Sequence, residues 1–130
     1  MKVRLAEEED FAWMLRIQRA SKLPFWKPNA TTWIVGKSAF AVWQKIGDEC
    51  ELLSIAVMKR NRRKGYAKQL MEHAHSQFKR LGVVKFFLEV RESNEPAISL
   101  YTKFGYERIA ERKGYYSDSE KAVIMSMQVQ

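Results

Sequence analysis

The sequence predicts a fold of mixed α/β (α+β) class, in which a mixed central sheet of about six to seven strands carries helices on both faces. The first observation behind this prediction is that apolar residues alternate between a period of two and a period of three to four, in the order β-α-β-β-β-α-β-α-β-β. The second is the length of 130 residues, which with 46% hydrophobic residues is enough for one domain over residues 1–130. The third is that the chain has only 6 Gly, 3 Pro and 1 Cys, which excludes collagen-like, disordered and disulfide-held chains.

The first 57 residues predict a strand, a helix and a three-stranded meander. Residues 2–5 alternate as a half-buried strand does, and the acidic run Glu7-Glu8-Glu9-Asp10 favours the N-terminus of a helix over about 7–20. A loop with two prolines follows over residues 22–29. Stretches rich in β-branched and aromatic residues then predict antiparallel strands over 32–36, 39–46 and 50–57.

The second half predicts two helices and three strands. Apolar residues at spacings of three and four predict a helix over about 65–80, and strict alternation predicts a strand over 84–90 that places Glu89 opposite its apolar face. Asn94 is a suitable N-cap, with Pro96 in the first turn of a helix that ends at Gly105. Two last strands, over about 105–112 and 121–128, flank a loop that contains Tyr115 and Tyr116.

The net charge of +8 is concentrated in one zone. Residues 59–85 contain nine cations and one acid, so the other 103 residues, with 14 cations and 14 acids, are neutral. A localised positive zone suits a polyanionic ligand, and both nucleic acid and a phosphorylated cofactor qualify. A solvated basic loop explains the zone equally well.

The most specific motif joins a buried strand to a helix through a cation-rich turn, from Ile55 to Lys68. Backbone N–H groups at a helix N-terminus lack intrahelical partners and face the positive end of the helix dipole, so they form an anion site. Gly65 allows a close approach of the backbone to a diphosphate. The six glycines are isolated from one another, which excludes a dinucleotide fingerprint and a Walker A loop.

These residues resemble the GNAT superfamily of N-acetyltransferases. Arg62-Arg-Lys-Gly65-Tyr-Ala67 is similar to the acetyl-CoA motif of that superfamily, Arg/Gln-x-x-Gly-x-Gly/Ala. The block from Leu88 to Tyr106 resembles the corresponding block of the ribosomal-protein alanine acetyltransferase branch. Two residues depart from the pattern: Ala67 replaces the commoner Gly, and Lys121 replaces an acid that often precedes the alanine of the last strand.

The resemblance implies a direct transfer of an acetyl group from acetyl-CoA to an amine. By motif position, it implies Glu89 as the base, directly or through water, and Tyr101 as the acid that protonates the leaving thiolate. It implies that backbone groups at Ile55, Ala56 and Val57 receive the pantetheine arm, and that the remaining cofactor contacts come from Arg62, Arg63, Lys64, Gly65, Tyr66, Ala67, Lys68 and Asn94. Tyr115 and Tyr116, with Trp26 as a weaker candidate, are implied as acceptor-binding residues.

Each of these roles has a structural alternative. Glu89 could be a surface carboxylate paired with Lys85 or Arg91, Tyr101 could only pack, and Asn94 could only cap its helix. His73 and His75 are expected to be solvated helix residues, because their spacing puts them on different faces and no Cys or acid cluster completes a metal site. Cys50 is expected to be a small strand residue.

The function that we expect is therefore acetyl-CoA-dependent acetylation of a primary amine, foremost the N-terminal α-amine of a protein such as a ribosomal protein. An α-amine with a pKa of about 8 demands less of a carboxylate base than a lysine amine near 10.4. A small-molecule acceptor such as an aminoglycoside or polyamine, a nucleic-acid-binding module and a CoA-binding protein without catalysis stay as alternatives. With no secretory segment and no apolar run near about 18 residues, a cytoplasmic monomer or homodimer without a membrane partner is expected.

Overall fold

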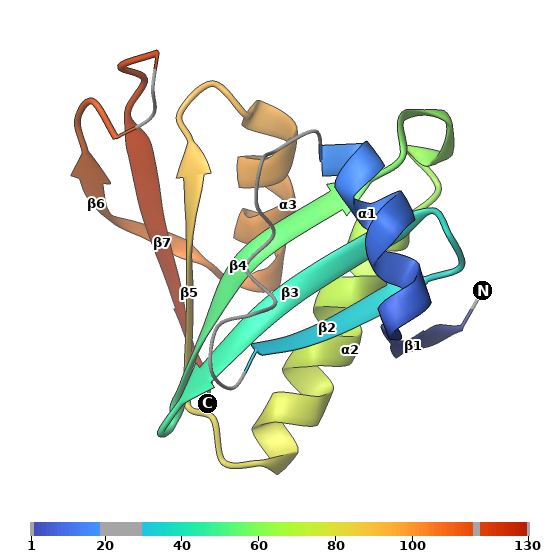
Figure 1. The fold of residues 1–130 in the computed structure, drawn as a ribbon. Coiled ribbons are helices and arrows are strands. Elements are labelled where there is room, and N and C mark those ends of the chain that lie inside the picture. The colour runs from blue at the N-terminus through green and yellow to red at the C-terminus, as the bar shows by residue number, and fades with distance from the viewer. Residues whose placement is uncertain (1, 19–29, 116–117, 130) are drawn as a thin grey trace.

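The computed structural model of the protein describes residues 2–18, 30–115 and 118–129 (Figure 1). The elements in this part of the chain are β1 (Val3–Leu5), the 3₁₀ turn η1 (Glu8–Asp10), α1 (Phe11–Gln18), β2 (Ala30–Val35), β3 (Ala39–Ile46), β4 (Glu49–Val57), the 3₁₀ turn η3 (Lys59–Asn61), α2 (Tyr66–Arg80), β5 (Lys85–Arg91), α3 (Glu95–Phe104), β6 (Glu107–Arg112) and β7 (Ala122–Gln128). The predicted element order is confirmed, with ends that differ by at most two residues where both are described. Helix 7–20 differs in that its first turn is a 3₁₀ turn, and residues 19 and 20 lie outside the described residues.

The seven strands form one mixed sheet in the order β1-β2-β3-β4-β5-β7-β6. Neighbours pair antiparallel, except β4 and β5, which pair parallel. Two parallel neighbours need a long crossover, and α2 supplies it. The β4–β5 pair is therefore the place where two antiparallel parts of the sheet meet.

Helices cover both faces of the sheet, as predicted. Figure 1 shows α1 in front of the sheet, with α2 and α3 behind it. The core under α1 consists of Trp13, Met14, Ile34, Phe40 and Val42. The larger core under α2 and α3 includes Trp43, Leu70, Met71, Phe78, Phe86, Leu88, Tyr101, Tyr106 and Met125.

The start of α1 is fastened to β1 by one buried carboxylate. Arg4 donates two hydrogen bonds to Asp10, of 3.1 and 3.2 Å, and Trp13 Nε1 donates a third, of 2.9 Å. The backbone N–H of Glu7 donates a fourth, of 2.8 Å, which closes the first turn as a capping box. Asp10 is only 1% exposed, so these bonds replace the water that its charge would otherwise need.

None of the helices in the described ranges is both long enough and apolar enough to cross a membrane.

Candidate active site

The site lies where β4 and β5 separate. Their parallel pairing runs from Glu49↔Lys85 to Leu52↔Leu88 and then stops. Directly after that point β4 contains a bulge, because Trp43 of β3 pairs with Leu52 while its neighbour Val42 pairs with Ser54, so that Leu53 has no partner. A bulge bends its strand, and β4 then continues with β3 while β5 continues with β7.

A cavity of about 330 Å³ occupies the divergence of the two strands. It is lined by Leu52, Leu53, Ser54, Ile55, Glu89, Val90, Arg91, Asn94 and Tyr101. The structure thus brings both predicted catalytic residues together with two of the predicted cofactor residues, Ile55 and Asn94. The other lining residues were missed by the sequence analysis, since the bulge that turns Leu53 and Ser54 toward the cavity has no Gly or other recognisable mark in the sequence.

Tyr101 reaches the cavity from the buried face of α3. The side chain is 4% exposed, and its ring centroid lies 5.9 Å from that of Tyr106. Tyr101 therefore packs in the core and lines the cavity at once, so the structural alternative and a catalytic role are compatible. At the start of α3, Asn94 Oδ1 accepts a 3.3 Å hydrogen bond from the backbone N–H of Ala97, which is the predicted N-cap.

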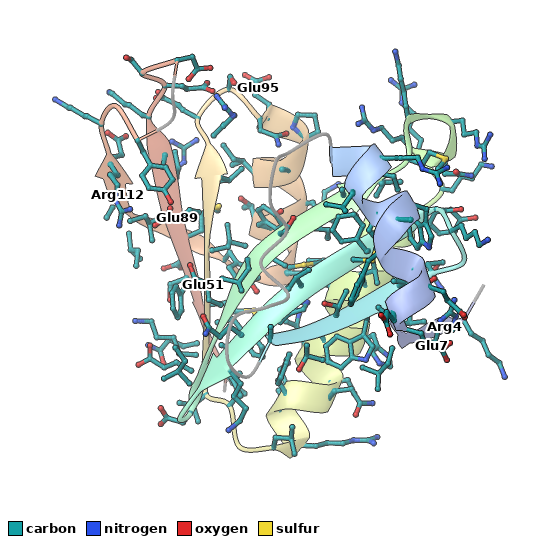
Figure 2. The ribbon with its side chains drawn as sticks, viewed as in Figure 1. Arg4, Glu7, Glu51, Glu89, Glu95 and Arg112 are labelled. Carbon is teal, nitrogen blue, oxygen red and sulfur yellow. The ribbon has the colours of Figure 1, made fainter. Side chains whose placement is uncertain are left out.

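Glu89 lies on the face of β5 that α2 and α3 do not cover. Phe86, Leu88 and Val90 are buried on the opposite face, which confirms the predicted alternation for these three, whereas Val84, also predicted on that face, lies before the strand and is exposed. The Glu89 side chain is 21% exposed, and its Oε1 lies 3.4 Å from Nη2 of Arg112. Figure 2 shows these two side chains on one face of the sheet, with Glu51 of β4 on the same side.

The observed partner of Glu89 corrects the surface pair that the sequence suggested. Arg91 instead pairs with Asp118 at 2.7 Å and with Glu120 at 3.0 Å, across the end of β7. Among the ion pairs of the described residues, that of Glu89 is with Arg112 and not with Lys85 or Arg91. The sequence offered no indication of this pair, because it depends on the register of β6 against β7.

Tyr115 extends the same cluster toward solvent. The guanidinium carbon of Arg112 lies 4.6 Å from the centroid of the Tyr115 ring. The charge of the Glu89 carboxylate, and then a hydrogen bond with it, raise the pKa of the Tyr115 hydroxyl. Glu89, Arg112 and Tyr115 thus form one contiguous group, of which Glu89 lines the cavity. Tyr116 and Trp26, the other predicted acceptor-binding residues, lie outside the described residues.

The cation-rich turn before α2 leads into an uncapped helix N-terminus. Arg63 and Gly65 both adopt left-handed backbone conformations, with φ of 67° and 79°. Arg62, directly before them, is extended. Helix α2 starts without a side-chain cap and without an acid in its first turn, so its N–H groups are available to an anion. Arg62, Arg63 and Lys64 are exposed around it.

The remaining predicted cofactor residues on α2 and at the end of β4 differ in their exposure and contacts. Tyr66 is half-buried and packs against the core, and Ala67 beside it is also half-buried. Lys68 is exposed and forms an ion pair of 3.9 Å with Glu72, one turn along the helix. At the end of β4, the Val57 carbonyl accepts a 3.3 Å hydrogen bond from Arg62 Nε. Because Lys68 on α2 already pairs with an acid, the turn before α2 is a better candidate for binding an anion than the side of the helix.

The histidines do not behave as predicted. His75 is buried, with Nε2 2.8 Å from the hydroxyl of Tyr106, and its ring packs against Phe86 and Phe104. His73 is half-buried, with its ring 4.9 Å from that of Trp33. The prediction of solvated histidines is therefore wrong, because α2 packs on the sheet with both rings against strand residues, Trp33 for His73 and Phe86 for His75. In the described part of the chain no group of three or more His, Cys, Asp or Glu is placed to hold a metal ion, and Cys50 is buried in β4.

The comparisons with known proteins agree with this geometry. Residues 3–106 match the acetyltransferase (GNAT) family. The chain is 32% identical to the [ribosomal protein bS18]-alanine N-acetyltransferase of Haemophilus ducreyi, over 92% of this chain and 94% of that one. It is 38% identical over 95 residues to the Salmonella typhimurium protein of the same name, a match that covers 71% of this chain but only 64% of that relative.

A similar result comes from solved structures. The crystal structure of the ribosomal-protein-S18-alanine N-acetyltransferase from Escherichia coli matches with a TM-score of 0.86 at 32% identity, over 99% of this chain and 94% of that one. The likeness extends over the whole sheet, including the part before residue 50 where the motifs give no information. The resemblance seen in the motifs is confirmed, and the chain belongs to the GNAT acetyltransferase family.

Proposed function

We propose that this protein transfers an acetyl group from acetyl-CoA directly to the N-terminal α-amine of a protein. The observation that carries the proposal is that Glu89 and Tyr101, one from β5 and one from α3, line a single cavity at the divergence of β4 and β5. A carboxylate and a phenol on one cavity are the proton acceptor and proton donor that such a transfer needs.

The residues present fit acetyl-CoA. The uncapped N-terminus of α2 offers free backbone N–H groups for the diphosphate, and the turn before it offers three exposed cations. A Cβ built on Gly65 would meet nothing within 4 Å, so the space beside this turn is open. Past Leu52, no strand of the described residues pairs with the edge of β4 that faces β5, and the backbone groups of this edge are the ones that we assign to the pantetheine arm.

The donor supplies an activated acetyl thioester, and the chain supplies the position and the protons. The Glu89 carboxylate accepts a proton from the acceptor ammonium, so that the nitrogen lone pair can form the new C–N bond. As the C–S bond breaks, the Tyr101 hydroxyl donates its proton to the departing sulfur, and the second proton that the nitrogen loses as the amide forms returns to the Tyr101 oxygen. Backbone groups of Ile55, Ala56 and Val57 hold the thioester carbonyl and stabilise the negative charge that develops on its oxygen.

A protein N-terminus is the acceptor that the site favours. The face of the sheet around Glu89 also carries Glu51, which the strand register places beside Phe87, so an ammonium group meets two carboxylates there, beside the guanidinium of Arg112. Tyr115 is exposed next to Arg112, where it can form a wall for an extended peptide. The relatives named above are, by their names, alanine N-acetyltransferases of ribosomal protein bS18, and we propose a protein acceptor of the same class here.

A panel of acceptors tests this proposal. It contains peptides with a free N-terminal alanine, the same peptides with a blocked N-terminus and an internal lysine, and small amines including a polyamine and an aminoglycoside. We expect CoA release with the free peptides and none above background with the blocked ones. Turnover of small amines only would contradict the acceptor, and binding of acetyl-CoA without turnover of any amine would contradict catalysis.

A further inference from the structure

We propose that Arg112 is a positioning residue that links the Glu89 carboxylate to the acceptor wall at Tyr115, so that acceptor binding and orientation of the base depend on one side chain. The inference rests on the proposed function, since it assigns Arg112 a role through Glu89. The sequence motifs do not indicate this residue, which belongs to the exposed edge strand β6.

The guanidinium group of Arg112 contacts Glu89 and Tyr115 at the same time. One end, Nη2, lies 3.4 Å from Glu89 Oε1, while the carbon at its centre lies 4.6 Å from the Tyr115 ring centroid. A planar guanidinium can accept an aromatic ring on its face and donate hydrogen bonds at its edge at the same time, which a lysine ammonium cannot do. Arg112 therefore makes both contacts with a single rotamer.

Arg112, Glu89 and Tyr115 form a triangle in which Arg112 contacts both of the other groups. The charge of Glu89 and a hydrogen bond with it also raise the pKa of the Tyr115 hydroxyl, so these two groups are coupled as well. A carboxylate held from two sides has fewer accessible rotamers, and a fixed base is more effective than a mobile one.

The strand register places Glu89 and Arg112 on one face of the sheet. The register places Arg112 opposite Ala122 and Glu89 opposite Ile124, so both side chains project from the same face of the sheet across β7. Arg112 is also the last residue of β6, immediately before the loop that contains Tyr115. A rigid strand end is well suited to anchor the loop that follows it.

This placement predicts how the site responds to an acceptor. The side chain of Arg112 is 52% exposed, and it holds a cation beside Glu89 on the solvent side. An acceptor ammonium approaches the same carboxylate, so Arg112 orients Glu89 before the acceptor arrives. As an exposed ion pair, it contributes little to stability, of the order expected for surface pairs.

The test is a double-mutant cycle between Arg112 and Glu89 in steady-state kinetics with an N-terminal alanine peptide. We expect Arg112→Gln to lower kcat/KM for the peptide roughly tenfold, with KM for acetyl-CoA unchanged. Arg112→Lys should recover part of the loss, because it restores the charge but not the stacking. In the Glu89→Gln background, Arg112→Gln should cost less than about twofold, because the group through which Arg112 acts is already gone.

The matched control is Arg108→Gln, since Arg108 is an exposed arginine of the same strand that pairs with Met125 and projects from the other face. Its kinetics should equal those of the unmodified protein. Equal losses from Arg112→Gln in both backgrounds, or unchanged kinetics in Arg112→Gln while Glu89→Gln is impaired, would overturn this inference alone. Unchanged turnover in Glu89→Gln would overturn the proposed base and this inference together.

Discussion

His75 Nε2 lies 2.8 Å from the hydroxyl oxygen of Tyr106, and both side chains are buried between α2, α3 and the sheet. Trp43, Phe86 and Phe104 surround the imidazole with their rings at 5.8, 4.7 and 5.2 Å. This burial, with a smaller effect of Lys79, lowers the pKa of His75 to about 4. In the folded protein, His75 therefore stays neutral between pH 6.5 and 4, where the same histidine of an unfolded chain becomes protonated.

The first prediction is that acid destabilises the protein through His75. The unfolded histidine titrates near 6.5, so between pH 6.5 and 4 the unfolded state binds more protons and the free energy of unfolding falls as the pH falls. The full effect below pH 4 is about 3 kcal/mol. Urea titrations of His75→Gln at several pH values should show a flatter dependence over this range. His73→Gln, a half-buried control, should keep most of the slope.

The second prediction concerns Asp10. Burial alone would raise the pKa of this carboxyl, but hydrogen bonds from the Glu7 backbone, Trp13 and Arg4 lower it overall. Its contribution to stability is therefore complete at neutral pH and lost as the pH falls below about 3.8. Asp10→Ala should cost about 2–3 kcal/mol at pH 7, because buried donors lose their acceptor. Glu8→Ala, an exposed acid of the same turn, should cost less than about 0.5 kcal/mol.

Features that depend on residues close together in the sequence could be predicted, whereas contacts between distant elements could not. Local rules predicted β5 from its alternation and the start of α3 from Asn94, and both are confirmed. The burial of His75 depends on the rings that the sheet and the end of α3 place around it, and the partner of Glu89 depends on the register of β6 against β7. Neither is encoded in a local period, so both were predicted wrongly.

The same distinction applies within the site. Glu89, Tyr101, Asn94 and Ile55 came from a motif and line one cavity, as expected of residues that a motif holds together. Leu53 and Ser54 enter the cavity through a bulge, which requires knowledge of how β3 pairs with β4. The motif thus predicts which residues meet, whereas the strand pairing decides which others join them.

The third prediction concerns the anion site. Gly65→Glu should abolish binding of acetyl-CoA in calorimetry, because it places a carboxylate beside the turn that we assign to the diphosphate. Gly47→Glu is a matched control, since Gly47 also has a positive φ, of 63°, and open space at its Cβ. Both variants should lose about 1–2 kcal/mol of stability from backbone strain. Only the Gly65 variant should lose binding, and equal binding in the two variants would contradict the assignment.

The fourth prediction concerns Tyr101. Tyr101→Phe removes one hydroxyl and keeps the ring against Tyr106, so folding and acetyl-CoA affinity should change little. If the hydroxyl protonates the departing sulfur, kcat should fall on the order of 10²-fold or more. Steady-state measurement of CoA release with an N-terminal alanine peptide gives this kcat. Unchanged kcat would make Tyr101 a packing residue only.

The fifth prediction separates a catalytic Glu89 from a merely paired one. Glu89→Gln keeps the shape of the side chain but has negligible basicity, so we expect kcat to fall by about 10²- to 10⁴-fold while acetyl-CoA affinity is retained. An ion pair with Arg112 without catalytic importance predicts instead a stability change of about 0–1 kcal/mol and unchanged turnover. Glu111→Gln, which breaks the 3.7 Å ion pair with Lys121, is the control for the loss of a carboxylate from the same sheet.

The pH dependence of the Glu89→Gln enzyme provides the more direct test. Without a base, only acceptor amine that is already deprotonated in solution can react, so the residual rate should climb with pH until it reaches the pKa of that amine, about 8 for an N-terminus. The unmodified enzyme should gain less over the same range, because Glu89 removes the proton within the complex. A residual rate that does not follow the amine would contradict Glu89 as the base, and a water molecule held by backbone carbonyls at the β4–β5 divergence would then have to accept the proton.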